Sequence, residues 1–503
     1  MDVPALARPE AEALSELDGL GVFFDADFPP TNESLAIPPT RAPWEQQITQ
    51  WRRADVALPG KELFSDEGGC TISCGDIVDD TWLANALVTV SQRPALLRHI
   101  FASIDHLEEG MLTLRLHKHG GWRPVLIDSM VPCGDDGGPA FCVSSGEQWP
   151  SLLLKAYAKL HGSYAALDGG DVGEALVDLT GGVVTTYPLP GSDEEEDLDA
   201  LWGAMMKDHK RSMLQALVPA AADPDSELRS ELTQPLLLGQ HYPLLELREP
   251  SRGLRLVCLR NPWPTGGWNG AWSSGAAEWH NHPEAASSLQ QVRRCPTPSP
   301  SPAPSPAPSP APSPTSIPTP ASGSHPAQGP DRIWIEMSDL VKYFGSRFCL
   351  LASSDGTESH SMAVGGAWGE FSNGGPPSQS SWCSNPQYWL VLSASAHVSI
   401  ELTQPDRRLV DRRMGGGGED EPYTPIALSV VRGGVVSSMD YGRVWSRNER
   451  NLVAETSPAR KREVSTAWPA TLTTLYLRAP CGLALALRPA PTPPPAPPRL
   501  PPH

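Results

Sequence analysis

Residues 295–330 limit what this chain can fold into more than any other segment, because a Ser-Pro and Ala-Pro repeat dominates them. Proline at alternate positions removes backbone donors and fixes φ, so this segment cannot join a helix or a sheet. The repeat therefore predicts an extended, disordered insert between two ordered stretches. A second proline-rich stretch covers residues 489–503 and predicts a proline-rich tail.

The bulk properties exclude several classes of protein. A length of 503 residues allows two to four domains at roughly 100–200 residues each. The net charge of −19 argues against nucleic acid as a partner, since phosphate binding needs a positive surface. The 9 cysteines show no metal-ligand spacing backed by a second pair, which indicates reduced thiols. Neither a signal peptide nor a long apolar run occurs, so we predict a soluble, cytoplasmic protein without a transmembrane segment.

Helical patterns come first along the chain. Residues 81–90 carry apolar side chains at helical spacing and predict a buried helix whose positive end lies at residues 79–82. Residues 152–160 predict a second helix, which Gly162 ends. Residues 198–217 predict a third, after an acidic run at 193–197 that we expect to be a solvated loop.

Strand patterns dominate the second half. Residues 236–247 and 254–259 are apolar runs separated by a turn, which predicts a hairpin. Earlier, residues 111–116 and 124–127 predict two short strands. Between residues 346 and 488, short β-rich runs are separated by Gly, Pro and Asn turns, which favours an antiparallel β-sandwich. These runs are Tyr388–Leu392, Val398–Leu402, Ile426–Val431, Thr473–Leu477 and Leu483–Leu487.

Several motifs, in order along the chain, resemble the calpain family. No single motif is specific to this family, but the occurrence of all of them in the family's order is. They are Phe28-Pro29-Pro30, Ile72–Leu87, Trp149–Tyr164, Gly169-Gly170, Asp178–Gly182, Arg260-Asn261-Pro262-Trp263, Trp268–Trp272, Glu278-Trp279 and Asn385-Pro386-Gln387-Tyr388.

The resemblance implies an α+β fold, with a papain-like two-lobed calpain protease core followed by an antiparallel β-sandwich. From the resemblance we expect five segments: an N-terminal tail at 1–20, lobe 1 at 21–192, lobe 2 at 193–345 with the disordered insert 295–330, a β-sandwich at 346–488, and a proline-rich tail at 489–503.

The same resemblance assigns catalytic positions, and most of them carry other residues. A calpain-type site needs a cysteine at a helix N-terminus, where the helix dipole favours the thiolate. Thr81 stands at that position, and Cys74 stands where the family has the glutamine that holds the oxyanion. Cys74 as a substitute nucleophile is a further alternative. Trp82 and Trp263 match tryptophans that wall the cleft.

The histidine and asparagine positions lie in the second half. Aligned on Tyr242, the catalytic histidine position holds Gln240, and His241 is shifted by one residue. A shift by one turns a strand side chain to the opposite face, so only a β-bulge could bring His241 back as a base. Asn261, which would orient the histidine, is retained.

Calcium ligands implied by the resemblance are mostly replaced. Glu147 matches a glutamate ligand, but Thr71, Gly267, Ser274 and Arg332 stand where carboxylates are expected. Calcium takes six to eight oxygen ligands, usually with several carboxylates. We therefore expect the calcium sites of the core to be lost or very weak. No cofactor is assigned, and calcium stays an open alternative.

These substitutions lead to three hypotheses. The first is a pseudoprotease, a calpain-like scaffold that binds protein or peptide partners without cutting them. The second is a working endopeptidase that uses Thr81 or Cys74 with His241. The third is an adaptor whose tail docks SH3 or WW domains through a PxxPxR pattern at Pro494, Pro497 and Arg499.

Contact of the β-sandwich with a membrane surface is a further alternative for its partners. The residues that could support it are Arg407, Arg408, Arg412 and Arg413. Four basic residues in a chain of net charge −19 are also what a solvated edge contains.

Overall fold

The fold is that of a computed structural model. It describes residues 10–17, 21–36, 44–65, 72–73, 81–118, 120–141, 143–144, 146–189, 195–209, 213–218, 236, 239–261, 267–291, 332–344, 346–351, 360–364, 372, 374–376, 378–391, 396–404, 406, 425–432, 452–456, 463–470, 474–478 and 483–489. The chain divides into two compact units. One unit combines Met1–Thr186 with Phe348–His503, and the other is Tyr187–Arg347. The insert at 295–330 and tail residues 490–503 lie outside the described residues.

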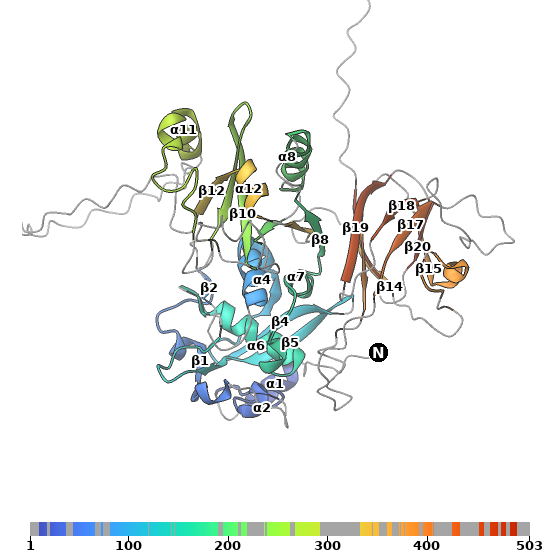
Figure 1. Ribbon diagram of the computed structural model, residues 1–503. Coiled ribbons are helices and arrows are strands. Elements are labelled where there is room, and N and C mark those ends of the chain that lie inside the picture. Colours follow the sequence, from blue (N-terminus) through green and yellow to red (C-terminus); the bar gives the residue numbers. More distant parts are fainter. Residues whose placement is uncertain are drawn as a thin grey trace, which may run out of the picture. The chain divides into compact units, whose positions relative to one another are not determined.

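The first part of the first unit mixes helices with small antiparallel sheets (Figure 1). Strands β3, β4 and β5 form a three-stranded sheet, while β1 pairs with β6 and β2 with β7. The elements are α1 (Glu10–Leu17), α2 (Asn32–Leu35), β1 (Gln50–Arg53), α3 (Ala54–Ala57), β2 (Ile72–Ser73), α4 (Thr81–Ser91), α5 (Pro94–Ile100), β3 (Phe101–Ser103), β4 (Met111–Lys118), β5 (Gly121–Asp128), β6 (Met130–Cys133), β7 (Val143–Ser144), α6 (Trp149–His161), α7 (Val172–Thr180) and β8 (Val183–Pro188).

Helix α4 is buried, as the sequence predicts. Leu83, Ala86, Leu87 and Val90, the residues at helical spacing, all have 0% exposure. The other faces of α4 are buried as well, and the helix contacts α5 and α7. Burial on every face is typical of a helix in the core of a large domain rather than on its surface.

Helix α6 is buried along its whole length and includes two lysines. The Lys155 ammonium contacts the Asp128 carboxylate and donates to the Met130 carbonyl at 2.7 Å. The Lys159 ammonium contacts the Asp25 carboxylate at 2.7 Å and the Leu126 carbonyl at 2.8 Å. Gly162 ends the helix with φ +98, a left-handed conformation that glycine adopts without a Cβ penalty. The predicted end of this helix is thus confirmed.

The second unit is built on an antiparallel sheet. Its strand order is β12-β11-β10-β9-β13-β8. The chain enters this unit through β8 and leaves it through β13. The predicted hairpin is confirmed as β10 (His241–Ser251) and β11 (Leu254–Arg260), with Ser251 opposite Leu254. The remaining elements are α8 (Glu195–His209), β9 (Met213–Leu217), α10 (Glu278–Asn281), α11 (Pro283–Gln291), β12 (Arg332–Glu336), α12 (Met337–Tyr343) and β13 (Ser346–Leu351).

The helix predicted at 198–217 is wrong in its second half. Helix α8 ends at His209, and residues Met213–Leu217 form β9, which pairs with β10. Tertiary pairing with β10 overrides the local helix preference there. The predicted acidic loop is also wrong at Glu195–Asp197, which form the first turn of α8. Acidic side chains stabilise that end of a helix through its dipole.

The C-terminal part of the first unit contains two four-stranded antiparallel sheets, orange to red in Figure 1. Their orders are β14-β21-β16-β19 and β15-β20-β17-β18. The strands predicted from the sequence are present, while the sandwich arrangement of the sheets stays a prediction. The strands are β14 (His360–Val364), β15 (Gln387–Val391), β16 (Ala396–Thr403), β17 (Ser429–Arg432), β18 (Leu452–Glu455), β19 (Glu463–Ala470), β20 (Thr474–Arg478) and β21 (Leu483–Pro489).

Across the described part of the chain, every helix is too short or too polar to cross a membrane.

Candidate functional site

Thr81, which we predict to stand at the nucleophile position, is the first residue of α4, and the predicted helix start is confirmed. Its neighbour Trp82 is 5% exposed, and the indole Nε1 donates to the Leu167 carbonyl at 3.1 Å. Gly170 lies directly against this indole, where a Cβ would have no room. Gly170 and the Leu167 carbonyl therefore hold Trp82, and with it the start of α4, in place. Cys74 lies outside the described residues.

His241 and Asn261 lie at the same end of the sheet in the second unit. His241 opens β10 and is 5% exposed, and Asn261 directly follows β11 and is 9% exposed. Because Leu244 pairs with Leu259 in antiparallel register, the start of β10 and the end of β11 coincide. Trp263 lies outside the described residues.

An irregularity in the sheet precedes His241. The Val218 carbonyl accepts from the Gly239 N–H at 3.0 Å, and the Val218 N–H donates to the Gln240 carbonyl at 3.1 Å. With Gly239 at φ +71, two residues oppose one in the pattern of a G1 bulge. From His241 onward the pairing with Leu217 is regular. The bulge therefore does not change which way His241 points relative to Tyr242.

The structure thus groups only some of the predicted catalytic residues. Gln240, His241 and Asn261 belong to the second unit, and Thr81 belongs to the first.

Glu147 is used to hold a loop. One carboxylate oxygen accepts from the Ser65 N–H at 2.7 Å, and the other accepts from the Trp149 indole at 2.6 Å. Ser274 and Gly267 lie in the described loop before α10, and Thr71 lies outside the described residues. A lone glutamate that is already engaged by two N–H groups does not fit the carboxylate-rich set that calcium needs.

Arg332 places a positive group where the resemblance leads one to expect a calcium ligand. Its guanidinium donates to Glu246 at 2.9 Å, and Arg248 donates to the same carboxylate at 3.0 and 2.8 Å. Burial alone would raise the pKa of Glu246, but the hydrogen bonds and charges of the two arginines outweigh it and lower that pKa. A guanidinium thus fills the cationic role next to this carboxylate, and the second-lobe residues do not fit calcium either.

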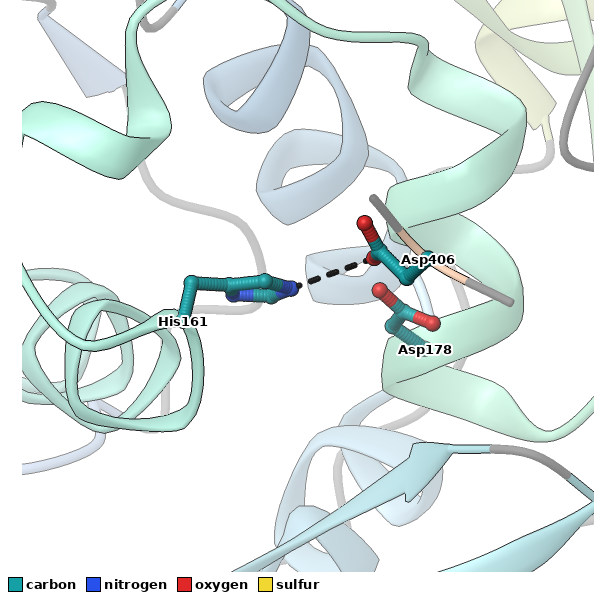
Figure 2. Close-up of side chains that lie close together, drawn as sticks. All are labelled: His161, Asp178 and Asp406. Atoms are coloured by element: carbon teal, nitrogen blue, oxygen red, sulfur yellow. Dashed lines mark ion pairs between the residues drawn. The ribbon is translucent and has the colours of Figure 1, made fainter. Parts of the chain in front are cut away.

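A buried charged cluster was missed by the sequence analysis. It consists of Lys118 from the end of β4, His161 from the end of α6, Asp178 from α7, and Asp406 from beyond β16, and we call it the Lys118 cluster. The Lys118 ammonium contacts Asp178 at 2.5 Å and Asp406 at 2.6 Å. Figure 2 shows the His161 ring directed at the Asp406 carboxylate, at 3.4 Å. No sequence signal pairs residues so far apart.

His161, Asp178 and Asp406 lie close enough together to suggest a metal site, with their ligand atoms within 4.8 Å of one another. However, the Lys118 ammonium already contacts both carboxylates. A second cation beside it would be repelled, so the donor set does not fit a metal ion.

Comparison with known proteins assigns the family. A sequence profile described as "Calpain family cysteine protease" matches residues 23–294. The calpain-type cysteine protease DEK1 of Arabidopsis thaliana is 31% identical over 402 residues, which cover 76% of this chain and 16% of that protein. The calpain-1 catalytic subunit of Homo sapiens is 30% identical over 273 residues, which cover 52% of this chain and 37% of that protein.

Calpain-B of Drosophila melanogaster is 32% identical over 279 residues, which cover 52% of this chain and 28% of that protein. The chain therefore spans only part of the length of each of these relatives. The match to the family profile extends over more than half of the chain, and it includes α4 with Thr81, the β10–β11 hairpin and Asn261. By this match and by its α+β core of helices and antiparallel sheets, the chain belongs to the calpain family of cysteine proteases.

Proposed function

We propose that this calpain-family chain binds protein or peptide segments without cleaving them. The observation that carries the proposal is Thr81 at the first position of α4. A helix dipole activates a thiol by stabilising its thiolate, but a threonine hydroxyl has no accessible anion near pH 7. A hydroxyl at this position could attack a carbonyl only with a strong base beside it.

The residues of the second unit support the same conclusion. Gln240 occupies the histidine position of the family, and an amide side chain cannot accept and return a proton as an imidazole does. The bulge at Gly239 and Gln240 leaves His241 in regular pairing with β9. Asn261 directly follows β11, where its proposed role is to hold the hairpin in place.

The loss of calcium dependence belongs to the same proposal. Glu147 is engaged by Ser65 and Trp149, and Arg332 pairs with Glu246. A protein that no longer assembles a catalytic site does not need calcium to organise one. The partners that we propose are therefore unfolded or extended protein segments, bound by the calpain-type core in the cytoplasm.

The competing function is an active endopeptidase of the calpain type. The names of the relatives favour it, because DEK1 of Arabidopsis thaliana is described as a calpain-type cysteine protease. The buried His241 beside the retained Asn261 is the structural feature that it would use.

Hydrolysis and binding of casein by the purified chain separate the two functions. The variants are Thr81→Cys and the double variant Thr81→Cys/Gln240→His, each assayed with and without millimolar calcium. We expect the wild type to retain casein in a pull-down without cutting it, and the double variant to cut it. Thr81→Ser is the matched control, because it changes the side chain without supplying a thiol.

Cleavage by the wild type that Thr81→Ala or His241→Ala abolishes would establish the endopeptidase instead. A wild type that neither cuts nor retains casein or extended peptides would contradict the binding function.

A further inference from the structure

The Lys118 cluster joins two parts of the chain that are distant in sequence. Lys118, His161 and Asp178 come from the region matched by the calpain family profile, while Asp406 follows β16 in the C-terminal β-rich region. All four side chains are buried, with Asp406 and His161 at 0% exposure. Asp406 therefore reaches into a closed polar socket formed by residues of the first 180 positions.

The socket is balanced in charge without Asp406. Lys118 and Asp178 form a one-to-one pair, and the Tyr157 hydroxyl donates to the same Asp178 oxygen at 2.5 Å. Asp406 brings a second carboxylate to the same ammonium, at 2.6 Å. Two carboxylates this close repel each other strongly in a dry interior unless positive groups lie between them.

His161 supplies a further contact to Asp406. Its Nδ1 lies 2.8 Å from the Tyr157 carbonyl, and because a carbonyl only accepts, Nδ1 is the donor. That assignment leaves Nε2 facing the Asp406 oxygen at 3.4 Å (Figure 2), and this contact is an ion pair when Nε2 carries a proton as well. Two side chains from different elements, Lys118 and His161, thus converge on Asp406.

We propose that Asp406 is an intramolecular latch, which docks the C-terminal β-rich region onto the socket made by Lys118, His161 and Asp178. The partner of this socket is Asp406 of the same chain. Lys118 and His161 both meet the same Asp406 oxygen, so a side chain without a carboxylate at position 406 would lose both charge contacts.

The latch lies close to the nucleophile position. Tyr157, which donates to Asp178, makes an edge-on contact with the Trp82 ring at 6.0 Å between centroids. Trp82 directly follows Thr81 at the start of α4. Docking of Asp406 therefore helps to fix Tyr157 and Trp82 beside the start of α4, whether or not the chain cleaves peptides.

Hydrogen exchange of the full chain, followed by mass spectrometry, tests the latch. Asp406→Asn removes the charge with little change in shape, and the exposed Asp55→Asn on α3 is the matched control for the loss of one negative charge. We expect Asp406→Asn to accelerate exchange about tenfold or more in β16 and at the ends of β4 and α6, while exchange in β10 and β11 stays unchanged. Exchange within about twofold of wild type in β16 and the socket would overturn the proposal.

A second pair of variants tests the charge argument even if Asp406→Asn folds poorly. Lys118→Met leaves Asp178 and Asp406 facing each other, so adding Asp406→Asn to it should raise the thermal midpoint or recover soluble protein. Such a rescue by a second mutation is opposite in sign to additive damage. A double variant that melts no higher than Lys118→Met, or that remains equally insoluble, would overturn the latch.

Discussion

At the scale of single residues, buried lysines organise the core through charge. Lys155 and Lys159 extend from α6 to Asp128 and Asp25, which lie far away in sequence. Burial lowers the pKa of Lys155, and the neighbouring Asp128 opposes that shift. Burial likewise raises the pKa of Asp25, although Lys159 opposes it. Each buried ammonium is tolerated because a carboxylate and a backbone carbonyl accept from it, and each carboxylate also accepts from backbone N–H groups.

Replacing Lys155 with methionine should strongly destabilise the first unit. The apolar stem is kept, but Asp128 is left as a buried charge without its ammonium partner. Removing one member of a buried pair costs about 3–5 kcal/mol. Urea unfolding followed by far-UV circular dichroism measures the loss.

The control for this variant is Lys207→Met on α8, where the lysine is exposed. Its effect should stay within about 0.5 kcal/mol, as for most surface changes. A Lys155→Met variant as stable as the control would show that Asp128 does not depend on Lys155.

At the scale of elements, side-chain pairs connect the strands of the second unit. Glu246 of β10 accepts hydrogen bonds from Arg332 of β12 across the intervening strand β11. The two arginines hold the pKa of Glu246 below its ordinary value of 4.5 despite partial burial. The carboxylate therefore stabilises the sheet in its charged form.

This lowered pKa predicts how stability depends on pH. The unfolded chain takes up the proton first as the pH falls below about 4.5, because its glutamate has the ordinary pKa. The contribution of Glu246 is thus complete above that pH and is lost as the pH falls through the lower pKa of the folded state. We expect the stability gap between wild type and Glu246→Gln to shrink from pH 6 to pH 3, as measured by urea unfolding across that series.

Glu249→Gln is the matched control, since Glu249 is exposed on the same strand and the amide oxygen of the introduced side chain can still accept from the Gly253 N–H. Its stability difference from wild type should show little pH dependence. If the two variants behave alike, the arginine pairs do not control the acid response.

At the scale of the whole molecule, the chain keeps the α+β core of its family, and we predict that it has lost the calcium sites. The calpain profile covers residues 23–294, yet Glu147 is engaged by N–H groups and Arg332 replaces an expected carboxylate. From both features we predict that calcium binds the core weakly or not at all.

Calcium should therefore have little effect on the thermal stability of the full chain. A site whose Kd is no tighter than the calcium concentration stabilises by at most about 0.4 kcal/mol. We expect millimolar calcium to shift the thermal midpoint by no more than about 1–2 °C relative to magnesium, measured by calorimetry. A shift of several degrees that is specific to calcium would contradict this expectation.

The sequence by itself determined the family, the positions of α4 and α6, the β10–β11 hairpin and most strands of the C-terminal sheets. These features depend on local periodicity, on turn residues such as Gly162 and Gly253, and on motifs that lie within short segments. The family resemblance also puts Thr81, Gln240 and Asn261 at the expected catalytic positions, and that assignment stays a prediction.

Tertiary structure alone decided the rest. Residues 213–217 became a strand because β10 offered a partner, against their local helical pattern. The bulge at Gly239 depends on Val218, and the engagement of Glu147 and Arg332 depends on side chains brought together by folding. Lys118 and Asp406 are separated by 288 positions, and nothing local to either residue records the other. Charge pairing inside a protein is set by which atoms share a dry pocket, and only the folded chain defines that pocket.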